Sequence, residues 1–169
     1  TKDLTDAQGR QEVIRKLFDK FFQYALPKSA DKFGIVYTPV EIVDFIIHSV
    51  ENVMENEFHQ KLTNPDVKIL DPFTGTGTFI AELMRVLKEC GATNEQLEYK
   101  YSHDIWCNEI RLLAYYISLI NIEDTYNRLT SNYKPFTHAV LTDTFEMSEY
   151  KPGEEYQGHL NEEEDFKEA

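Results

Sequence analysis

Apolar residues recur at intervals of three and four near the start of the chain, which is the period of an amphipathic helix. The pattern runs over residues 6–25 and stops before Pro27, which favours a helix end there. The apolar positions are Val13, Ile14, Leu17, Phe18, Phe21 and Phe22. We therefore predict an N-terminal helix over this stretch.

A second helical pattern follows Thr38-Pro39 and continues through Val43, Ile47 and Met54. Threonine is favoured at the N-cap and proline at the first helical position. With Glu41 at the third position, the sequence predicts a helix that begins with a capping box.

Three apolar stretches downstream alternate with helical patterns. We predict strands over residues 67–71, 99–105 and 138–142, the first of them buried. The intervening helices are expected over residues 78–90, with Gly91 as its C-terminal cap, and over 108–122, and residues 91–98 are expected to form an extra loop. Strands that alternate with helices favour parallel pairing with right-handed crossovers, so the expected fold class is α/β.

Composition narrows the function. The 169 residues include 17 basic and 30 acidic side chains, a net charge of −13, which argues against a broad grip on a phosphate backbone. Two cysteines cannot form a disulfide framework or a four-ligand zinc site. No apolar run reaches the length of about 18 residues that a membrane helix needs. We expect a cytoplasmic protein.

The segment 71–79 carries the chemistry. An aspartate ends the first expected strand, and Gly75 and Gly77 then lead into a helix. A phosphate-binding P-loop would need a lysine here, and the dinucleotide pattern would need glycine in place of Ile80. An acid beside a helix N-terminus suits a ligand that carries both charges, such as the amino-acid end of S-adenosylmethionine. A plain turn without a ligand is the alternative.

At these residues a family resemblance becomes visible. Residues 71–79 resemble motif I of the amino-methylating DNA methyltransferases, and residues 34–45 resemble motif X, in the order typical of the gamma class of N6-adenine enzymes. Residues 108–117 and 121–123 are similar to the methyltransferase region of the single-chain restriction–modification enzymes called type ISP. The resemblance covers about residues 8–146. It implies a partial Rossmann-like fold of the S-adenosylmethionine-dependent methyltransferases.

The resemblance also implies a set of cofactor-binding residues. The set is Tyr37, Thr38, Pro39, Asp71, Pro72, Phe73, Thr74, Gly75, Gly77, Thr78, Glu109, Ile110, Asp143 and Phe145. Motif X would approach the methionine part, and Asp71 would meet the amino-acid end above the two glycines. Asp143 would accept a hydrogen bond from the adenine amino group.

The acid that would accept both ribose hydroxyls is Glu109, with Asp104 as its competitor. A carboxylate suits this role because it can receive two hydrogen bonds at once. Ile110 and Phe145 would pack near the adenine. No catalytic residue and no metal ligand is expected in this chain, and its histidines and Cys107 are expected to be structural.

The family's catalytic Asn-Pro-Pro-aromatic motif does not occur in the sequence, and Asn64-Pro65 lacks the second proline. We therefore expect a fragment with three parts: a helical segment (1–60), a partial cofactor-binding domain (61–146) and an acidic tail (147–169). Alone it should not methylate DNA. The resemblance implies that double-stranded DNA is met through the parent protein, and that nuclease and helicase-type domains lie on the same parent chain. The alternatives are a methyltransferase acting on RNA or a small molecule, and a non-catalytic interaction domain.

Overall fold

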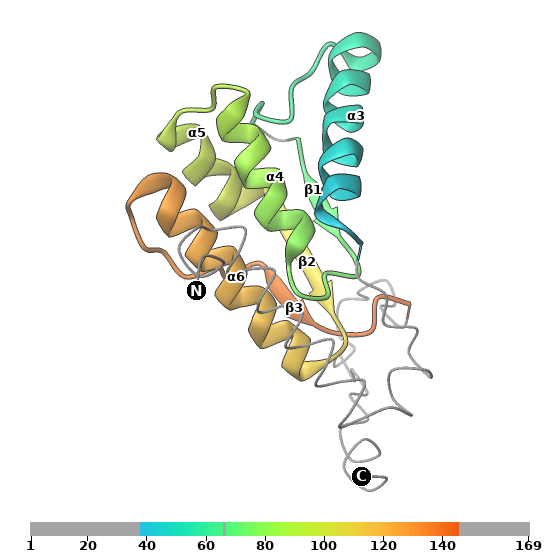
Figure 1. Cartoon of the computed structure of the whole chain (residues 1–169), viewed down its shortest axis with the longest axis vertical. Helices are drawn as coiled ribbons and strands as arrows, with labels where there is room; N and C mark the ends of the chain where they lie inside the picture. Colours follow the sequence, from blue (N-terminus) through green and yellow to red (C-terminus); the bar gives the residue numbers. More distant parts are fainter. Residues whose placement is uncertain (1–37, 66, 146–169) are drawn as a thin grey trace, which may run out of the picture. The chain divides into compact units, whose positions relative to one another are not determined.

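The computed structural model describes residues 38–65 and 67–145, all within one unit of the chain, Thr38–Gly158 (Figure 1). The described elements are α3 (Val40–Phe58), β1 (Ile69–Asp71), α4 (Thr78–Glu89), α5 (Asn94–Tyr99), the π-helix η1 (Lys100–Asp104), β2 (Ile105–Glu109), α6 (Leu112–Thr130) and β3 (Ala139–Leu141). The helix predicted over residues 6–25, Tyr37 and the tail 147–169 lie outside the described residues.

The three described strands form one parallel sheet in the order β1-β2-β3. Asp71 pairs with Cys107, and Glu109 pairs with Leu141. The α/β fold class and the parallel pairing expected from the sequence are confirmed. Because all three strands run the same way, the loops that follow them meet at one edge of the sheet.

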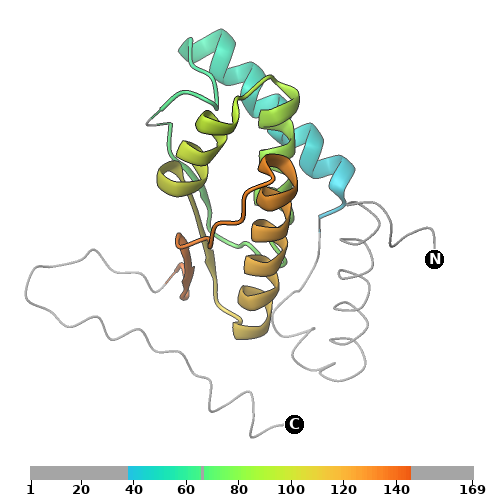
Figure 2. The same cartoon turned by 90° about the vertical axis from the view of Figure 1, so that its left-hand side faces the viewer.

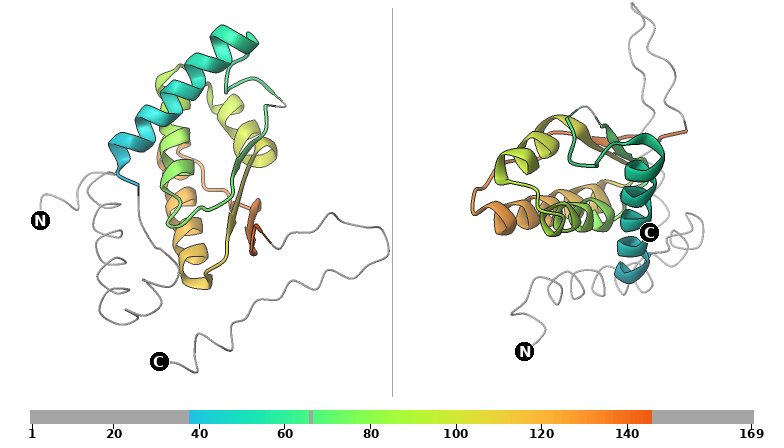
Figure 3. Two further views of the ribbon diagram at one scale, coloured as in Figure 1. Left: turned by 90° about the vertical axis from the view of Figure 1, so that its right-hand side faces the viewer. Right: turned by 90° about the horizontal axis from the view of Figure 1, so that it is seen from above.

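Helices α4 and α6 lie side by side on one face of this sheet, and α3 packs against α4 (Figures 2 and 3). The core between the layers contains Ile80, Leu87, Ile105 and Ile122, all almost fully buried. Leu70 points the other way and is 57% exposed. Within the described part of the chain, the first strand is therefore covered on one face rather than two. It is also shorter than predicted, since it spans only Ile69–Asp71.

Helix α3 confirms the second predicted helix, but the predicted capping box is wrong. Pro39 has extended backbone (ψ 143°), so helical geometry starts at Val40 and Pro39 itself is the N-cap, with no side-chain capping bond. Its carbonyl accepts the first helical hydrogen bonds, from the N–H groups of Ile42 and Val43.

The stretch predicted as the extra loop and the second strand is helical instead. Thr93 and Gln96 form a reciprocal capping box that starts α5. The chain then continues into η1, where the buried Lys100 forms an ion pair with Asp104 one turn later. Lys100 also donates to the carbonyls of Asn64 and Val67. Burial of a charged lysine is costly unless it is paired, and this pair joins the first and last residues of η1.

The second strand consequently lies later in the chain than predicted. It occupies Ile105–Glu109, and the following helix begins at Leu112 rather than at residue 108. This shift matters for function because it places Glu109 at the end of a strand instead of in the first turn of a helix.

Close packing between α4 and α6 depends on Gly77. Its φ of +80° lies in the left-handed region, and an added Cβ would sit 3.1 Å from both the Cα and the carbonyl oxygen of Ser118. Gly91, with a φ of +90°, caps the C-terminal end of α4 as predicted, and a Cβ there would meet nothing within 4 Å.

These two glycines give a matched test. Gly91→Ala should cost only left-handed backbone strain, about 1–2 kcal/mol of unfolding free energy. Gly77→Ala should cost the same strain plus a clash with backbone atoms, which adds about 1–3 kcal/mol. Urea denaturation of both variants measures the difference, and equal losses would contradict the packing role of Gly77.

Candidate functional site

Asp71 is the last residue of β1, and only one of its two carboxylate oxygens accepts a hydrogen bond. The oxygen Oδ1 accepts a hydrogen bond from the N–H of Phe73 at 3.1 Å, whereas Oδ2 is buried and has no hydrogen-bond partner. Burial raises the pKa of Asp71, and the Phe73 hydrogen bond only partly opposes that rise. A buried anionic oxygen without a partner is costly, so this carboxylate is suited to receive a cationic group.

Glu109 ends β2 and holds the glycine loop. Its Oε2 accepts from the N–H of Gly75 and its Oε1 accepts from the N–H of Arg111, both at 2.8 Å. Burial raises the pKa of Glu109, against the effect of these two hydrogen bonds. Gly75 has a φ of +56°, which aims its N–H at the carboxylate.

The loop between β1 and α4 is also held by the backbone of β2 and by α6. The N–H of Thr74 donates to the carbonyl of Asn108 at 2.9 Å, and Thr74 Oγ1 donates to the carbonyl of Asp71 at 3.2 Å. From α6, the buried Asn121 donates to the carbonyl of Thr76 at 2.8 Å. These contacts fix the loop before any ligand arrives.

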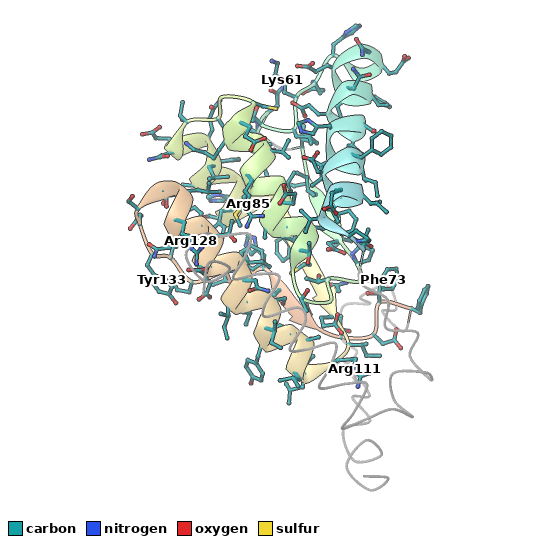
Figure 4. The ribbon with its side chains drawn as sticks, in the orientation of Figure 1. Lys61, Phe73, Arg85, Arg111, Arg128 and Tyr133 are labelled. Carbon is teal, nitrogen blue, oxygen red and sulfur yellow. The ribbon has the colours of Figure 1, made fainter. Side chains whose placement is uncertain are left out.

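The loop after β3 brings a third acid and an aromatic ring to the same edge. Asp143 Oδ1 accepts from the N–H of Phe145 at 2.9 Å. The ring of Phe145 lies 5.3 Å, centroid to centroid, from that of Phe73, although the two residues are 86% and 61% exposed. Figure 4 shows Phe73 and Arg111 at this edge, away from Lys61 and Tyr133.

The remaining predicted positions that the structure describes lie around this edge. Thr38 and Pro39 precede α3, whose N-terminal end lies at the same end of the unit as the start of α4 (Figures 1 and 3). Thr78 is the first residue of α4, and its hydroxyl lies 3.2 Å from that of Thr76. Ile110 follows Glu109 and is partly exposed.

Asp104, the competing acid, lies at the opposite end of β2. It is fully buried and pairs with Lys68 at 2.6 Å and Lys100 at 2.9 Å. Burial alone would raise the pKa of Asp104, but the hydrogen bonds from these two lysines lower it. Its carboxylate is therefore already neutralised, away from the edge that carries Asp71 and Glu109.

Three further features of the described residues bear on function. Burial raises the pKa of Cys107 to about 11, so its sulfur stays a thiol at neutral pH. No group of three or more side chains in residues 38–65 and 67–145 could hold a metal ion, and none of the helices there is long and apolar enough to cross a membrane.

Sequence reasoning missed the polar residues that support the site. Asn108 and Asn121 lie in the segments that resemble type ISP enzymes, but the sequence assigns no role to them or to Thr144. Asn108 directly precedes Glu109, and Thr144 lies between Asp143 and Phe145. Polar residues next to candidate ligand-binding residues were the available signal, but their partners depend on strand register.

Comparison with known proteins places the chain in a class. Residues 10–151 match the family model described as N-6 DNA Methylase. The chain therefore belongs to the N-6 DNA methylase family, which implies a methyltransferase that depends on S-adenosylmethionine. A search of curated proteins finds none that matches.

Solved structures give the more particular likeness. The chain is similar to the type ISP restriction–modification enzyme LlaBIII bound to DNA, with 40% identity and a TM-score of 0.78. It is also 40% identical to a nuclease-deletion mutant of the type ISP enzyme LlaGI in complex with a DNA substrate mimic (TM-score 0.73) and to DrdV in a DNA complex (TM-score 0.77).

These matches cover 97%, 94% and 83% of this chain for LlaBIII, LlaGI and DrdV respectively. They cover only 11%, 13% and 13% of the matched chains. The chain thus spans about an eighth of the length of these neighbours. The predicted family and the likeness to type ISP enzymes are confirmed.

The buried carboxylate predicts a pH-dependent gain in stability on substitution. Because the pKa of Asp71 is raised on folding, the unliganded protein loses stability as the pH rises through that pKa. Asp71→Asn cannot ionise and can still accept from the N–H of Phe73. Its thermal midpoint should exceed that of wild type by a few degrees at pH 7.5, and the difference should shrink toward pH 4.

Asp143→Asn is the matched control, since Asp143 makes the same turn with Phe145. It should leave the midpoint unchanged at both pH values. A variant Asp71→Asn that is less stable than wild type at pH 7.5 would show that the Asp71 carboxylate is not strained by burial.

Proposed function

We propose that this chain is the S-adenosylmethionine-binding portion of an adenine-specific N6 DNA methyltransferase that belongs to a larger restriction–modification enzyme. The observation that carries the proposal is the buried, unpartnered Oδ2 of Asp71, next to a glycine loop that Glu109 already holds in place.

The amino-acid end of the cofactor fits the first crossover. Its ammonium group would supply the hydrogen-bond donor and the positive charge that Asp71 Oδ2 lacks. Its carboxylate would face the N-terminal end of α4 at Thr78, where backbone N–H groups have no partner within the helix. Thr38, before α3, offers a further hydroxyl at the same end of the unit.

The nucleoside part of the cofactor would lie against the residues at the carboxyl ends of β2 and β3. Each carboxylate oxygen of Glu109 accepts one backbone N–H, which leaves lone pairs for the two ribose hydroxyls. Asp143 would accept a hydrogen bond from the adenine amino group. Ile110 and Phe145 are exposed apolar side chains that can pack on the adenine ring.

The bound cofactor supplies a methyl group on a sulfonium centre. The residues of this chain would hold both ends of that molecule so that its methyl group stays accessible to the adenine amine. Holding the flipped base needs an amide and an aromatic side chain, which the family's Asn-Pro-Pro-aromatic motif supplies and this sequence lacks. We therefore propose that the chain works with further polypeptide, which would also carry most of the DNA contacts.

The neighbours support this division of labour. Each was solved with DNA or a DNA substrate mimic, and the chain matches about an eighth of each. The net charge of −13 agrees with a cofactor-binding portion whose DNA-tracking surfaces lie elsewhere.

Calorimetric titration with two ligands tests the assignment of Asp71. S-adenosylmethionine has the amino-acid end, and 5′-methylthioadenosine lacks it. Wild type should prefer S-adenosylmethionine, and Asp71→Asn should weaken its binding by about 10- to 100-fold, the effect of losing a hydrogen bond to a charged group. Binding of 5′-methylthioadenosine should change little, because that ligand does not reach Asp71.

Asp124→Asn is the control, because Asp124 pairs with Arg128 on α6 and contacts none of the candidate residues. It should leave both affinities unchanged. A wild-type chain that gives no heat with S-adenosylmethionine would favour a non-catalytic interaction domain. Equal weakening of both ligands by Asp71→Asn would remove the proposed role of Asp71.

A further inference from the structure

One hydroxyl group joins the three strand ends that carry the candidate site. Thr144 Oγ1 donates to the carbonyl of Pro72 at 2.7 Å, and it accepts from Asn108 Nδ2 at 3.4 Å. Thr144 follows β3, Pro72 follows β1 and Asn108 belongs to β2. The bond to Pro72 spans 72 residues of sequence, so it is a tertiary contact and not a local turn.

Every member of this group is adjacent in sequence to proposed cofactor-binding residues. Pro72 lies between Asp71 and Phe73, and Thr144 lies between Asp143 and Phe145. The rings of Phe73 and Phe145 are in contact at 5.3 Å on the outer side of the same two loops. The β1 and β3 loops are therefore joined by both a polar and an aromatic contact.

The two loops would hold opposite ends of the cofactor. The β1 loop carries Asp71 for the amino-acid end, and the β3 loop carries Asp143 for the adenine. A ligand that spans both ends needs the two loops at a fixed separation. A loop that must be ordered on binding lowers affinity, because the ordering cost is subtracted from the contact energy.

We propose that Thr144 is a positioning residue that locks the β1 and β3 loops together, so that the two ends of the cofactor site are held at the correct separation before the cofactor binds. This inference rests on the proposed function for its ligand, but the lock itself is a property of the unliganded chain. Asn108 contributes two hydrogen bonds. Its side-chain amide donates to the hydroxyl of Thr144, and its backbone carbonyl accepts from the N–H of Thr74.

The valine and serine variants of Thr144 separate the hydroxyl from the shape of the side chain. Valine keeps the shape and removes both hydrogen bonds, whereas serine keeps the hydroxyl. The probes are S-adenosylhomocysteine, which spans both loops and transfers no methyl group, and adenosine, which would reach the β2 and β3 ends only.

Thr144→Val should weaken S-adenosylhomocysteine about tenfold, which is about 1.4 kcal/mol, and adenosine less than about threefold. Thr144→Ser should restore most of the affinity. Hydrogen exchange on the unliganded chain should show faster exchange at the amides of Phe73 and Thr74 in Thr144→Val. A residue that only stabilised the fold would affect both ligands alike.

Thr130→Val is the control for a general loss of stability. Thr130 Oγ1 also donates to a backbone carbonyl, that of Tyr126, but at the C-terminal end of α6. It should alter neither ligand affinity nor exchange at Phe73 and Thr74. Equal weakening of S-adenosylhomocysteine and adenosine by Thr144→Val, or no weakening of either, would overturn the proposal.

The two proposals fail in different ways. If wild type binds neither ligand, the cofactor site is refuted, and the exchange measurement alone decides the lock. If wild type binds S-adenosylhomocysteine but exchange at Phe73 and Thr74 is the same in Thr144→Val and wild type, the cofactor site stands and the lock is refuted.

Discussion

Parallel pairing of β1, β2 and β3 is the constraint from which the candidate site follows. Because the strands run the same way, Asp71, Glu109 and the residues after Leu141 reach one edge of the sheet. Glu109 then converts this proximity into a fixed arrangement, since its carboxylate accepts the N–H groups of Gly75 and Arg111. The Gly75 bond ties the first glycine of the loop directly to the end of β2.

The candidate site lowers the folding stability of the unliganded protein. Burial raises the pKa values of both Asp71 and Glu109, and Asp71 Oδ2 has no partner. Asp104 is also buried, but two lysines pair with its carboxylate and neutralise its charge. The contrast between a paired and an unpaired buried acid is what separates a structural carboxylate from one suited to a cationic ligand.

The sequence was informative where the signal was local. The glycine loop after Asp71 and the alternation of strands and helices gave the fold class, because short motifs and periodicity determine both. The prediction from local patterns is wrong over residues 91–104, where a loop and an aromatic-rich strand are expected but the chain is largely helical. There the ion pair of Lys100 with Asp104 and the capping box at Thr93 decide the structure. The role of Thr144 depends on strand register, which local patterns do not contain.

Amide chemical shifts during titration with S-adenosylhomocysteine test the central claim most directly. The account predicts shifts in three separate groups, at residues 71–78, 108–110 and 142–145, which saturate together at one ligand concentration. The amides of α5 and of the C-terminal half of α6 should stay unchanged. Shifts confined to one of the three groups, or centred on other elements, would contradict a single cofactor site at the carboxyl edge of the sheet.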